Sequence, residues 1–391
     1  MINCKSERIA SLPPYIFERI GRLNTQARAE GRDVIDLGMG NPDLPAPPHV
    51  IEKLKEAVDE PGVHRYSASK GISTLRQAIV KRYAKRFGVS LDPDKEAVAV
   101  IGSKEGLCHF ALAAFNPGEA ILVPNPSYPA HYFPFHIIGV RTQDMPLLAA
   151  NNFLPDLSKI NLKVEPRPKA MLLSFPHNPT TAVAGLDFMK EAVNFCRRSN
   201  LFLIHDLAYG ELVFDGGSAP SILQVPGAKE IAIEFYSLSK TYNMAGWRVG
   251  FAVGNEELVG ALVKLKSYYD YGVFTPIQLA AVAALNGSQE CVARTRQTYQ
   301  NRRDVLVSCL KKVGWNVPLS PATMYLWAPL PEKLQTMGSL AFATLLLEKA
   351  DVAVSPGVGF GPHGEGFVRI ALVENEQRLR QAARNIAKIL Q

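Results

Sequence analysis

The most informative part of this 391-residue sequence is Ser237-Leu238-Ser239-Lys240-Thr241-Tyr242-Asn243-Met244-Ala245-Gly246-Trp247-Arg248-Val249-Gly250. It directly follows an apolar run at residues 231–236, which is typical of a buried strand. A lysine at the end of a strand can form an imine with an aldehyde, and its amine can then carry a proton. Two serines and Arg248 supply hydroxyl donors and a guanidinium fork, which suit a phosphate dianion. Lys240 or Arg248 alone is more often a solvated cation, so the complete pattern is what indicates a cofactor site.

Around this stretch, short apolar runs alternate with helix-like segments, as in a mostly parallel sheet that helices cover on both faces. Strands are predicted at residues 97–101, 120–123, 170–175, 201–204, 231–236 and 249–253. Helices are predicted at residues 15–30, 49–60, 74–87 and 256–269, and Leu75, Ile79 and Tyr83 share one helix face. A long helix at 289–313 then leads to a smaller module with strands at 324–327 and 367–372 and helices at 339–349 and 376–389.

The composition is that of an ordinary globular protein, with 47% hydrophobic and 20% charged residues. No apolar run reaches about 18 residues and the first residues are polar, so we expect a cytoplasmic protein without a membrane helix. The net charge of +7 includes no dense basic run, which argues against nucleic-acid binding. An odd, widely spaced set of cysteines predicts neither a disulfide framework nor a zinc site, namely Cys4, Cys108, Cys196, Cys291 and Cys309.

The stretch 237–250 resembles the Ser-x-Ser-Lys-x-x-x-x-x-Gly-x-Arg-x-Gly signature of fold type I aminotransferases at every defining position. The resemblance covers essentially the whole chain and implies an enzyme that holds pyridoxal 5'-phosphate on Lys240 as a Schiff base. Within the family, the sequence is most similar to the subgroup of bacterial alanine (glutamate-pyruvate) and LL-diaminopimelate aminotransferases. The stretches that carry this similarity are Leu12-Pro13-Pro14-Tyr15, Met39-Gly40-Asn41-Pro42-Asp43 and Ser267-Tyr268-Tyr269-Asp270-Tyr271-Gly272.

The resemblance also implies a domain organisation. We expect an α/β fold, with a large domain whose mostly parallel sheet is covered by helices, as in fold type I, and a smaller α+β domain. Residues 1–45 should form an N-terminal arm and substrate loop that pack with the small domain. Residues 46–285 should form the large cofactor-binding domain, and residues 286–391 the small C-terminal domain.

Asp206 follows the predicted strand at 201–204, at the end where open α/β sheets build their sites. A carboxylate there can keep the pyridine nitrogen of the cofactor protonated, so that the ring acts as an electron sink. An N-cap aspartate is the alternative. By resemblance, Tyr209 and Asn178 bind the phenolic oxygen of the cofactor and Tyr128 stacks on its ring. A simple Asn-Pro turn and a core tyrosine are the alternatives for the last two.

A second candidate site for the phosphate is Gly102-Ser103-Lys104-Glu105-Gly106, which lies between a predicted strand and an apolar helix. Backbone donors at a helix N-terminus can face an anion, and the segment resembles the family's phosphate loop, with Ser103 and Lys104 as cofactor contacts. Ser237, Ser239 and Arg248 should bind the same group. Tyr66 resembles a tyrosine that reaches the phosphate in the neighbouring subunit, which implies a homodimer with shared sites.

Arg369 lies between apolar neighbours in the predicted strand at 367–372, and a buried arginine requires a partner. The α-carboxylate of a substrate is a suitable bidentate partner, and the position resembles the family's carboxylate-binding arginine. A salt bridge to a fixed acid is the alternative. Gly40 belongs to a loop that resembles the substrate-covering segment, where a side chain would crowd the ligand. Asn178 is a further expected substrate contact, and no metal site is expected.

The resemblance to this subgroup implies an aminotransferase that exchanges an amino group between alanine and 2-oxoglutarate by a ping-pong mechanism through Lys240. Aspartate and LL-diaminopimelate are rival donors, because Arg369 does not select a side chain. A pyridoxal-phosphate-dependent β-lyase or decarboxylase and a non-enzymatic ligand sensor share the scaffold and remain alternatives. The run Gly359-Phe360-Gly361-Pro362-His363-Gly364 matches a dinucleotide-binding pattern, but it precedes a strand where that motif requires a helix.

Overall fold

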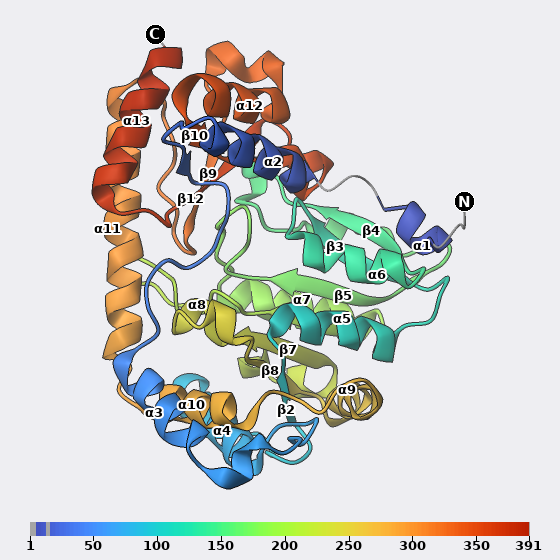
Figure 1. Ribbon diagram of the computed structural model, residues 1–391. Helices are drawn as coiled ribbons and strands as arrows, with labels where there is room; N and C mark the ends of the chain where they lie inside the picture. The colour runs from blue at the N-terminus through green and yellow to red at the C-terminus, as the bar shows by residue number, and fades with distance from the viewer. Residues whose placement is uncertain (1–4, 13–15, 391) are drawn as a thin grey trace.

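The computed structural model describes residues 5–12 and 16–390 and has a seven-stranded sheet at its centre (Figure 1). In order across the sheet, the strands are β2 (Ala97–Val100), β8 (Gly250–Gly254), β7 (Ala232–Ser237), β6 (Phe202–Asp206), β5 (Pro168–Ser174), β3 (Ala120–Asn125) and β4 (Arg141–Pro146). β8 is antiparallel to both of its neighbours, whereas the pairs from β7 to β4 are parallel. The expected mostly parallel sheet is therefore confirmed.

Six of these strands fall on the apolar runs that predict them. Every residue of β3, β7 and β8 is buried, because these strands have helices over both faces. The sequence does not predict β4, in which most residues are exposed or partly exposed. β4 pairs only with β3, at the edge of the sheet, and an edge strand of this kind needs no continuous apolar run.

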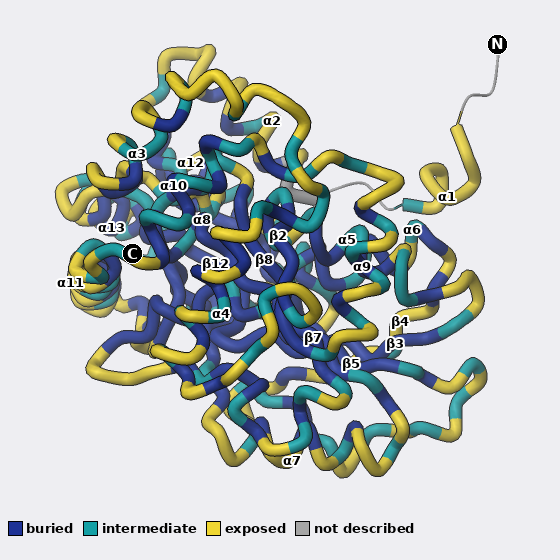
Figure 2. Tube along the Cα trace, turned by 90° about the horizontal axis from the view of Figure 1, so that it is seen from below, coloured by how far each residue is buried: buried dark blue, intermediate teal, exposed yellow. Residues whose placement is uncertain are grey.

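Helices pack on both faces of the sheet, and Figure 2 shows most of the strands, though not the edge strand β4, as buried segments inside more exposed helices. On one face, α5 (Ser103–Ala114) and α9 (Glu256–Tyr269) bury Phe110 and Leu262 against the strands. The cluster on the other face includes residues of α3 (Pro48–Val58), α4 (Ser73–Phe87), α7 (Leu186–Arg198) and α10 (Thr275–Asn286). Leu75, Ile79 and Tyr83 are all buried in that cluster, as their spacing in α4 predicts. Shorter helices are α1 (Glu7–Ala10), α6 (Phe133–Ile137) and α8 (Leu238–Thr241).

The predicted long helix is α11 (Glu290–Lys312), which runs along one side of the molecule toward the C-terminal elements (Figure 1). There β11 (Ser355–Pro356), β12 (Phe367–Ala371) and β9 (Tyr325–Pro329) form an antiparallel sheet. It packs with α12 (Ser339–Ala350) and α13 (Glu376–Leu390). The two strands and two helices predicted here are each within a few residues of the observed bounds.

The N-terminal segment is tied to these C-terminal elements. In α2 (Ile16–Ala29), Ile20 joins the apolar cluster that contains β9 and β12. β1 (Ile35–Asp36) pairs in parallel with β10 (Val352–Ala353), a contact that a two-residue strand gives no pattern to predict. This pairing favours the division at residues 45 and 285, which stays a prediction. Residues 13–15 lie outside the described residues. They include most of the stretch at 12–15 that carries part of the family resemblance, and the first residue of the helix predicted at 15–30.

The glycine-rich run at 359–364 lies in two short turns, η9 (Gly357–Phe360) and η10 (Pro362–Gly364), which lead into β12. It therefore does not open a helix, as a dinucleotide-binding motif requires. Across residues 5–12 and 16–390, none of the helices is both long enough and apolar enough to span a bilayer.

Candidate active site

A cavity of ≈ 1070 Å³ opens at the carboxyl ends of β5, β6 and β7, with β9, β11 and β12 on its far side. Parallel strands end at the same edge of a sheet, which is where such folds place their sites. The cavity brings together the predicted site residues Gly40, Ser103, Lys104, Tyr128, Asn178, Asp206, Tyr209, Ser237, Ser239, Lys240, Arg248 and Arg369. Tyr66 is not among the residues that line it.

Lys240 lies in α8, the single helical turn that follows β7. Ser237 caps this turn, because its hydroxyl accepts a hydrogen bond from the backbone N–H two residues on. Lys240 Nζ donates to the carbonyl oxygen of Gly40 at 3.0 Å. Burial lowers the pKa of Lys240, and the positive charges of Arg369 and Arg248 lower it further. When the pKa of a lysine is lowered, a larger fraction of its side chain is the neutral amine at neutral pH, and the neutral amine is the nucleophilic form.

Asp206 is the last residue of β6, and a histidine that the sequence does not single out holds its carboxylate. His131 Nε2 lies 2.9 Å from Asp206 Oδ2, and His131 Nδ1 lies 2.7 Å from Ser127 Oγ. The other carboxylate oxygen accepts a hydrogen bond from the backbone N–H of Ala208 at 3.2 Å. The ring of Tyr128 contacts His131 edge-on. His131 is 75 residues from Asp206, and only the adjacency of the segments after β3 and β6 brings them together.

Arg369, in β12, is 6% exposed and presents its guanidinium to the cavity. One terminal nitrogen donates to Asn178 Oδ1 at 2.9 Å, and the other donates to Gly38 O at 3.0 Å and to Ser355 Oγ at 3.3 Å. Its Nε is buried without a hydrogen-bond partner. All the partners are neutral, and no acidic side chain in the described part of the chain forms an ion pair with it. A buried, uncompensated cation of this kind suits an anionic ligand.

Tyr325 is a second cavity residue that the sequence does not single out. Its hydroxyl lies 2.9 Å from that of Tyr209, and the Arg369 guanidinium carbon lies 4.2 Å from the centre of its ring. Its position gives a reason for glycine at position 40 that the sequence does not show. A Cβ atom at Gly40 would collide with the hydroxyl and ring of Tyr325. Gly40 also lines the cavity, and its expected closeness to a ligand stays a prediction.

Cationic groups and backbone donors gather at the other end of the cavity. Gly102, with a φ of +85°, precedes Ser103 at the N-terminus of α5, and Lys104 follows. The Arg248 guanidinium lies against Gly102 so closely that a Cβ atom there would overlap it, and it donates to the Ala245 carbonyl at 2.9 Å. The cavity thus contains cationic groups and backbone donors at one end, the Lys240 amine with its lowered pKa, and the Asp206 carboxylate. This donor set fits pyridoxal phosphate.

Tyr66 lies on the surface with 84% of its area exposed. Its ring packs on Tyr271 with the two ring centres 4.4 Å apart. Three more exposed aromatic residues flank Tyr271 in the sequence, namely Tyr268, Tyr269 and Phe274. We call Tyr66, Tyr268, Tyr269, Tyr271 and Phe274 the aromatic cluster. Within one chain Tyr66 does not reach the cavity, so its expected contact with a phosphate requires a second chain.

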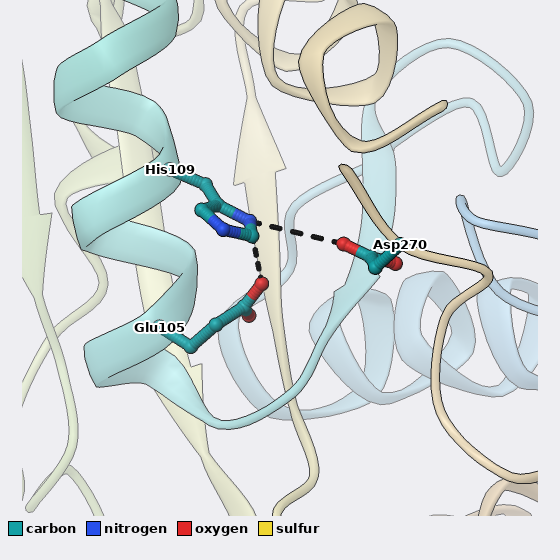
Figure 3. A group of neighbouring side chains, drawn as sticks. All are labelled: Glu105, His109 and Asp270. Atoms are coloured by element: carbon teal, nitrogen blue, oxygen red, sulfur yellow. Dashed lines mark ion pairs between the residues drawn. The ribbon is translucent and has the colours of Figure 1, made fainter. Parts of the chain in front are cut away.

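A group of potential metal ligands lies behind the phosphate end, where His109 on α5 faces Glu105 and Asp270 (Figure 3). His109 Nδ1 lies 2.6 Å from Glu105 Oε1 and 3.8 Å from Asp270 Oδ2. The fully buried Lys266 ammonium lies 2.9 Å from Asp270 Oδ2 and 3.8 Å from Glu105 Oε1. Lys266 therefore already supplies a cation to these carboxylates, and the group is explained as an ion network that ties α5 to the end of α9.

The sequence and the fold match one family of enzymes. The family described as aminotransferase class I and II matches residues 32–386. Glutamate-pyruvate aminotransferase AlaC of Escherichia coli is 50% identical over 97% of this chain and 92% of that protein. An LL-diaminopimelate aminotransferase of Moorella thermoacetica is 46% identical over 99% of this chain and 98% of that protein. Substrate-bound BacF of Bacillus subtilis has a TM-score of 0.95 and 36% identity, covering 99% and 98% of the two chains.

The phosphate cradle can be tested with Gly102→Ala. We expect the substitution to weaken binding of pyridoxal phosphate by about tenfold or more, because the new methyl group strains a positive-φ backbone and displaces Arg248. The measurement is a titration of the apoprotein with the cofactor, followed by fluorescence. Gly185→Ala is the control, since it adds the same methyl group in open space. Equal affinities of the two variants would show that Gly102 has no part in the phosphate site.

Proposed function

The chain belongs to the aminotransferase class I and II family of pyridoxal-phosphate-dependent enzymes, and we propose that it is a cytoplasmic enzyme that exchanges an amino group between alanine and 2-oxoglutarate. As an aminotransferase it acts on amino acids and 2-oxo acids. This proposal rests on the Arg369 guanidinium. It is buried, its hydrogen-bond partners are all neutral, and it lines the same cavity as Lys240. A carboxylate on Arg369 would bring a 2-amino acid into reach of Lys240.

Each residue has a proposed part in holding the cofactor. Lys240 would carry it as a Schiff base, and Tyr209 and Asn178 would bind its phenolic oxygen. Asp206, which His131 orients, would keep the pyridine nitrogen protonated. Tyr128 would stack on the ring. The phosphate would lie among Ser103, Lys104, Ser237, Ser239 and Arg248.

When bound, pyridoxal phosphate supplies an electron sink for the α-carbon of the substrate. The protein residues would then position and move protons. Arg369 would hold the α-carboxylate in a bidentate pair, and Asn178 would fix the guanidinium in that orientation. The Lys240 amine, released when the substrate amine takes its place, would accept the proton of the substrate α-carbon. Its lowered pKa favours this role, because a protonated amine cannot act as a base.

The choice of alanine as donor is supported by the similarity to the glutamate-pyruvate aminotransferase AlaC. The similarity to LL-diaminopimelate aminotransferases is nearly as high, so LL-diaminopimelate is the second candidate donor. Arg369 recognises the carboxylate common to all of these substrates and does not separate them. The distinction must come from contacts with the substrate side chain.

We also propose that the functional unit is a homodimer with shared sites. Each residue of the aromatic cluster is exposed, and the rings of Tyr66 and Tyr271 pack on each other at a tilt. Exposed aromatic groups of this size are typical of protein interfaces. In a two-fold dimer, Tyr66 would reach the phosphate end of the partner's cavity.

The substrate proposal can be tested by mixing the enzyme with a panel of amino donors and 2-oxo acids. With 2-oxoglutarate as acceptor, kcat/KM for alanine should exceed that for LL-diaminopimelate by about tenfold or more. Product formation is measured for each pair. Negligible turnover of alanine beside efficient turnover of LL-diaminopimelate would show that alanine is the wrong donor. The panel also includes a donor with a leaving group on its β-carbon, such as a cysteine S-conjugate. Release of the leaving group, ammonia and pyruvate from this donor without any 2-oxo acid would instead identify a β-lyase.

Arg369→Lys is the matched variant for this panel. It keeps the charge and removes the bidentate geometry, so it should weaken all donors together and leave their ranking unchanged. A reordered ranking would mean that Arg369 contacts the substrate side chain.

The shared site can be tested by mixing a Tyr66→Phe protein with a Lys240→Ala protein. Each mixed dimer should contain one site with both defects and one intact site, so random exchange should restore about one quarter of wild-type activity. Activity is measured before and after subunit exchange, which mass spectrometry confirms. Activity that stays at the mean of the two parent proteins despite exchange would contradict the sharing of Tyr66.

A further inference from the structure

Tyr325 lies between the group that should bind the substrate carboxylate and the groups that should bind the cofactor. It begins β9, where it pairs with Ala371 of β12, and only 2% of its area is exposed. Its ring lies under the Arg369 guanidinium, 4.2 Å from ring centre to guanidinium carbon. Its hydroxyl lies 2.9 Å from the hydroxyl of Tyr209, and both side chains line the cavity. Tyr325 therefore contacts both sides of the site.

The direction of the hydrogen bond between the two hydroxyls matters, because each has one proton to donate. If Tyr209 donates to Tyr325, the hydroxyl proton of Tyr209 is already used in that hydrogen bond, and Tyr209 can only accept a hydrogen bond from a group in the cavity. If Tyr325 donates, the Tyr209 proton is free to point at an acceptor in the cavity. A phenolic oxygen of a bound cofactor is such an acceptor, and it requires the second arrangement.

We propose that Tyr325 is a positioning residue that donates its hydroxyl proton to Tyr209 and thereby directs the Tyr209 proton toward the phenolic oxygen of the cofactor. This inference rests on the proposed cofactor site. Tyr325 acts through Tyr209 and not on the substrate itself. The adjacent Arg369 couples the pair to the substrate, because a bound carboxylate neutralises the charge above the Tyr325 ring.

The surroundings of the two phenols favour this direction. Burial raises the pKa of Tyr209, and the neighbouring Tyr325 raises it further, so Tyr209 keeps its proton. Burial acts in the same sense on Tyr325, but the adjacent Arg369 charge acts against it, and the pKa of Tyr325 is lowered. Between two neutral phenols, the more acidic one is the better donor. The charged and titratable groups around the pair are Lys240, Arg369, Arg248 and Tyr128.

The backbone next to Tyr325 keeps its hydroxyl in place. Gly40 packs directly against this hydroxyl, and any Cβ atom at Gly40 would displace it. The carbonyl of Gly40 also accepts the hydrogen bond from Lys240 Nζ. Gly40 thus contacts both the Tyr325 hydroxyl and the Lys240 amine. Tyr325→Phe removes only the hydroxyl oxygen, so it disturbs this packing less than any larger change.

The test compares wild-type holoenzyme with Tyr325→Phe, Tyr209→Phe and the double variant. The quantity measured is the pKa of the pH-dependent change in the visible absorbance of the bound cofactor. Loss of donation to the phenolic oxygen increases its electron density and the proton affinity of the Lys240 nitrogen joined to the cofactor, so this pKa should rise. We expect a rise of about half a unit to one unit for Tyr325→Phe and a larger rise for Tyr209→Phe.

The double variant decides whether Tyr325 acts through Tyr209. Its pKa should equal that of Tyr209→Phe alone, whereas independent effects would add. Tyr299→Phe is the control, because it removes another buried hydroxyl from the same apolar cluster and should leave the pKa unchanged. An unshifted pKa in Tyr325→Phe, or additive shifts in the double variant, would overturn the proposal while leaving the cofactor site intact. A wild-type protein without a cofactor absorbance band would refute the proposed cofactor site itself.

Discussion

Three neighbouring strands, β5, β6 and β7, run in parallel and end at one edge of the sheet, and the rest of the site depends on this shared edge. The residues at these ends or just beyond them include Asn178, Asp206 and Lys240, which are more than 25 positions apart in sequence and line one cavity. Their order along the sheet follows from the strand order alone. Because the strands are buried and covered by helices, the positions of these side chains are fixed by the core and not by flexible loops.

The C-terminal elements add a buried positive charge to the site. β12 carries Arg369 into the cavity wall, where its partners are neutral and its positive charge is uncompensated by the surrounding described residues. Burial lowers the pKa of Lys240, and the charges of Arg369 and Arg248 lower it further. In the proposed function, the two arginines that would bind the carboxylate and the phosphate would therefore also favour the neutral amine of Lys240.

The sequence predicts much of this arrangement, and its failures have physical causes. Strands buried on both faces are visible as apolar runs, and a lone arginine in such a run, as at Arg369, indicates a buried cation. The edge strand β4 is not visible, because most of its residues are polar and at least partly exposed. His131 and Tyr325 are not visible either, since their roles depend on contacts with residues 75 and 116 positions away. The sequence singles out Gly40, but the packing of Tyr325 against it depends on a residue 285 positions away and is not visible in the sequence.

Reduction with borohydride followed by peptide mapping would show which lysine holds the cofactor. Reduction fixes an imine as a stable secondary amine, so the cofactor remains on the lysine that carried it. We expect loss of the visible absorbance band and one modified peptide, the one that contains Lys240. A modified peptide containing a different lysine, or a reduced protein without bound cofactor, would show that Lys240 does not hold the cofactor.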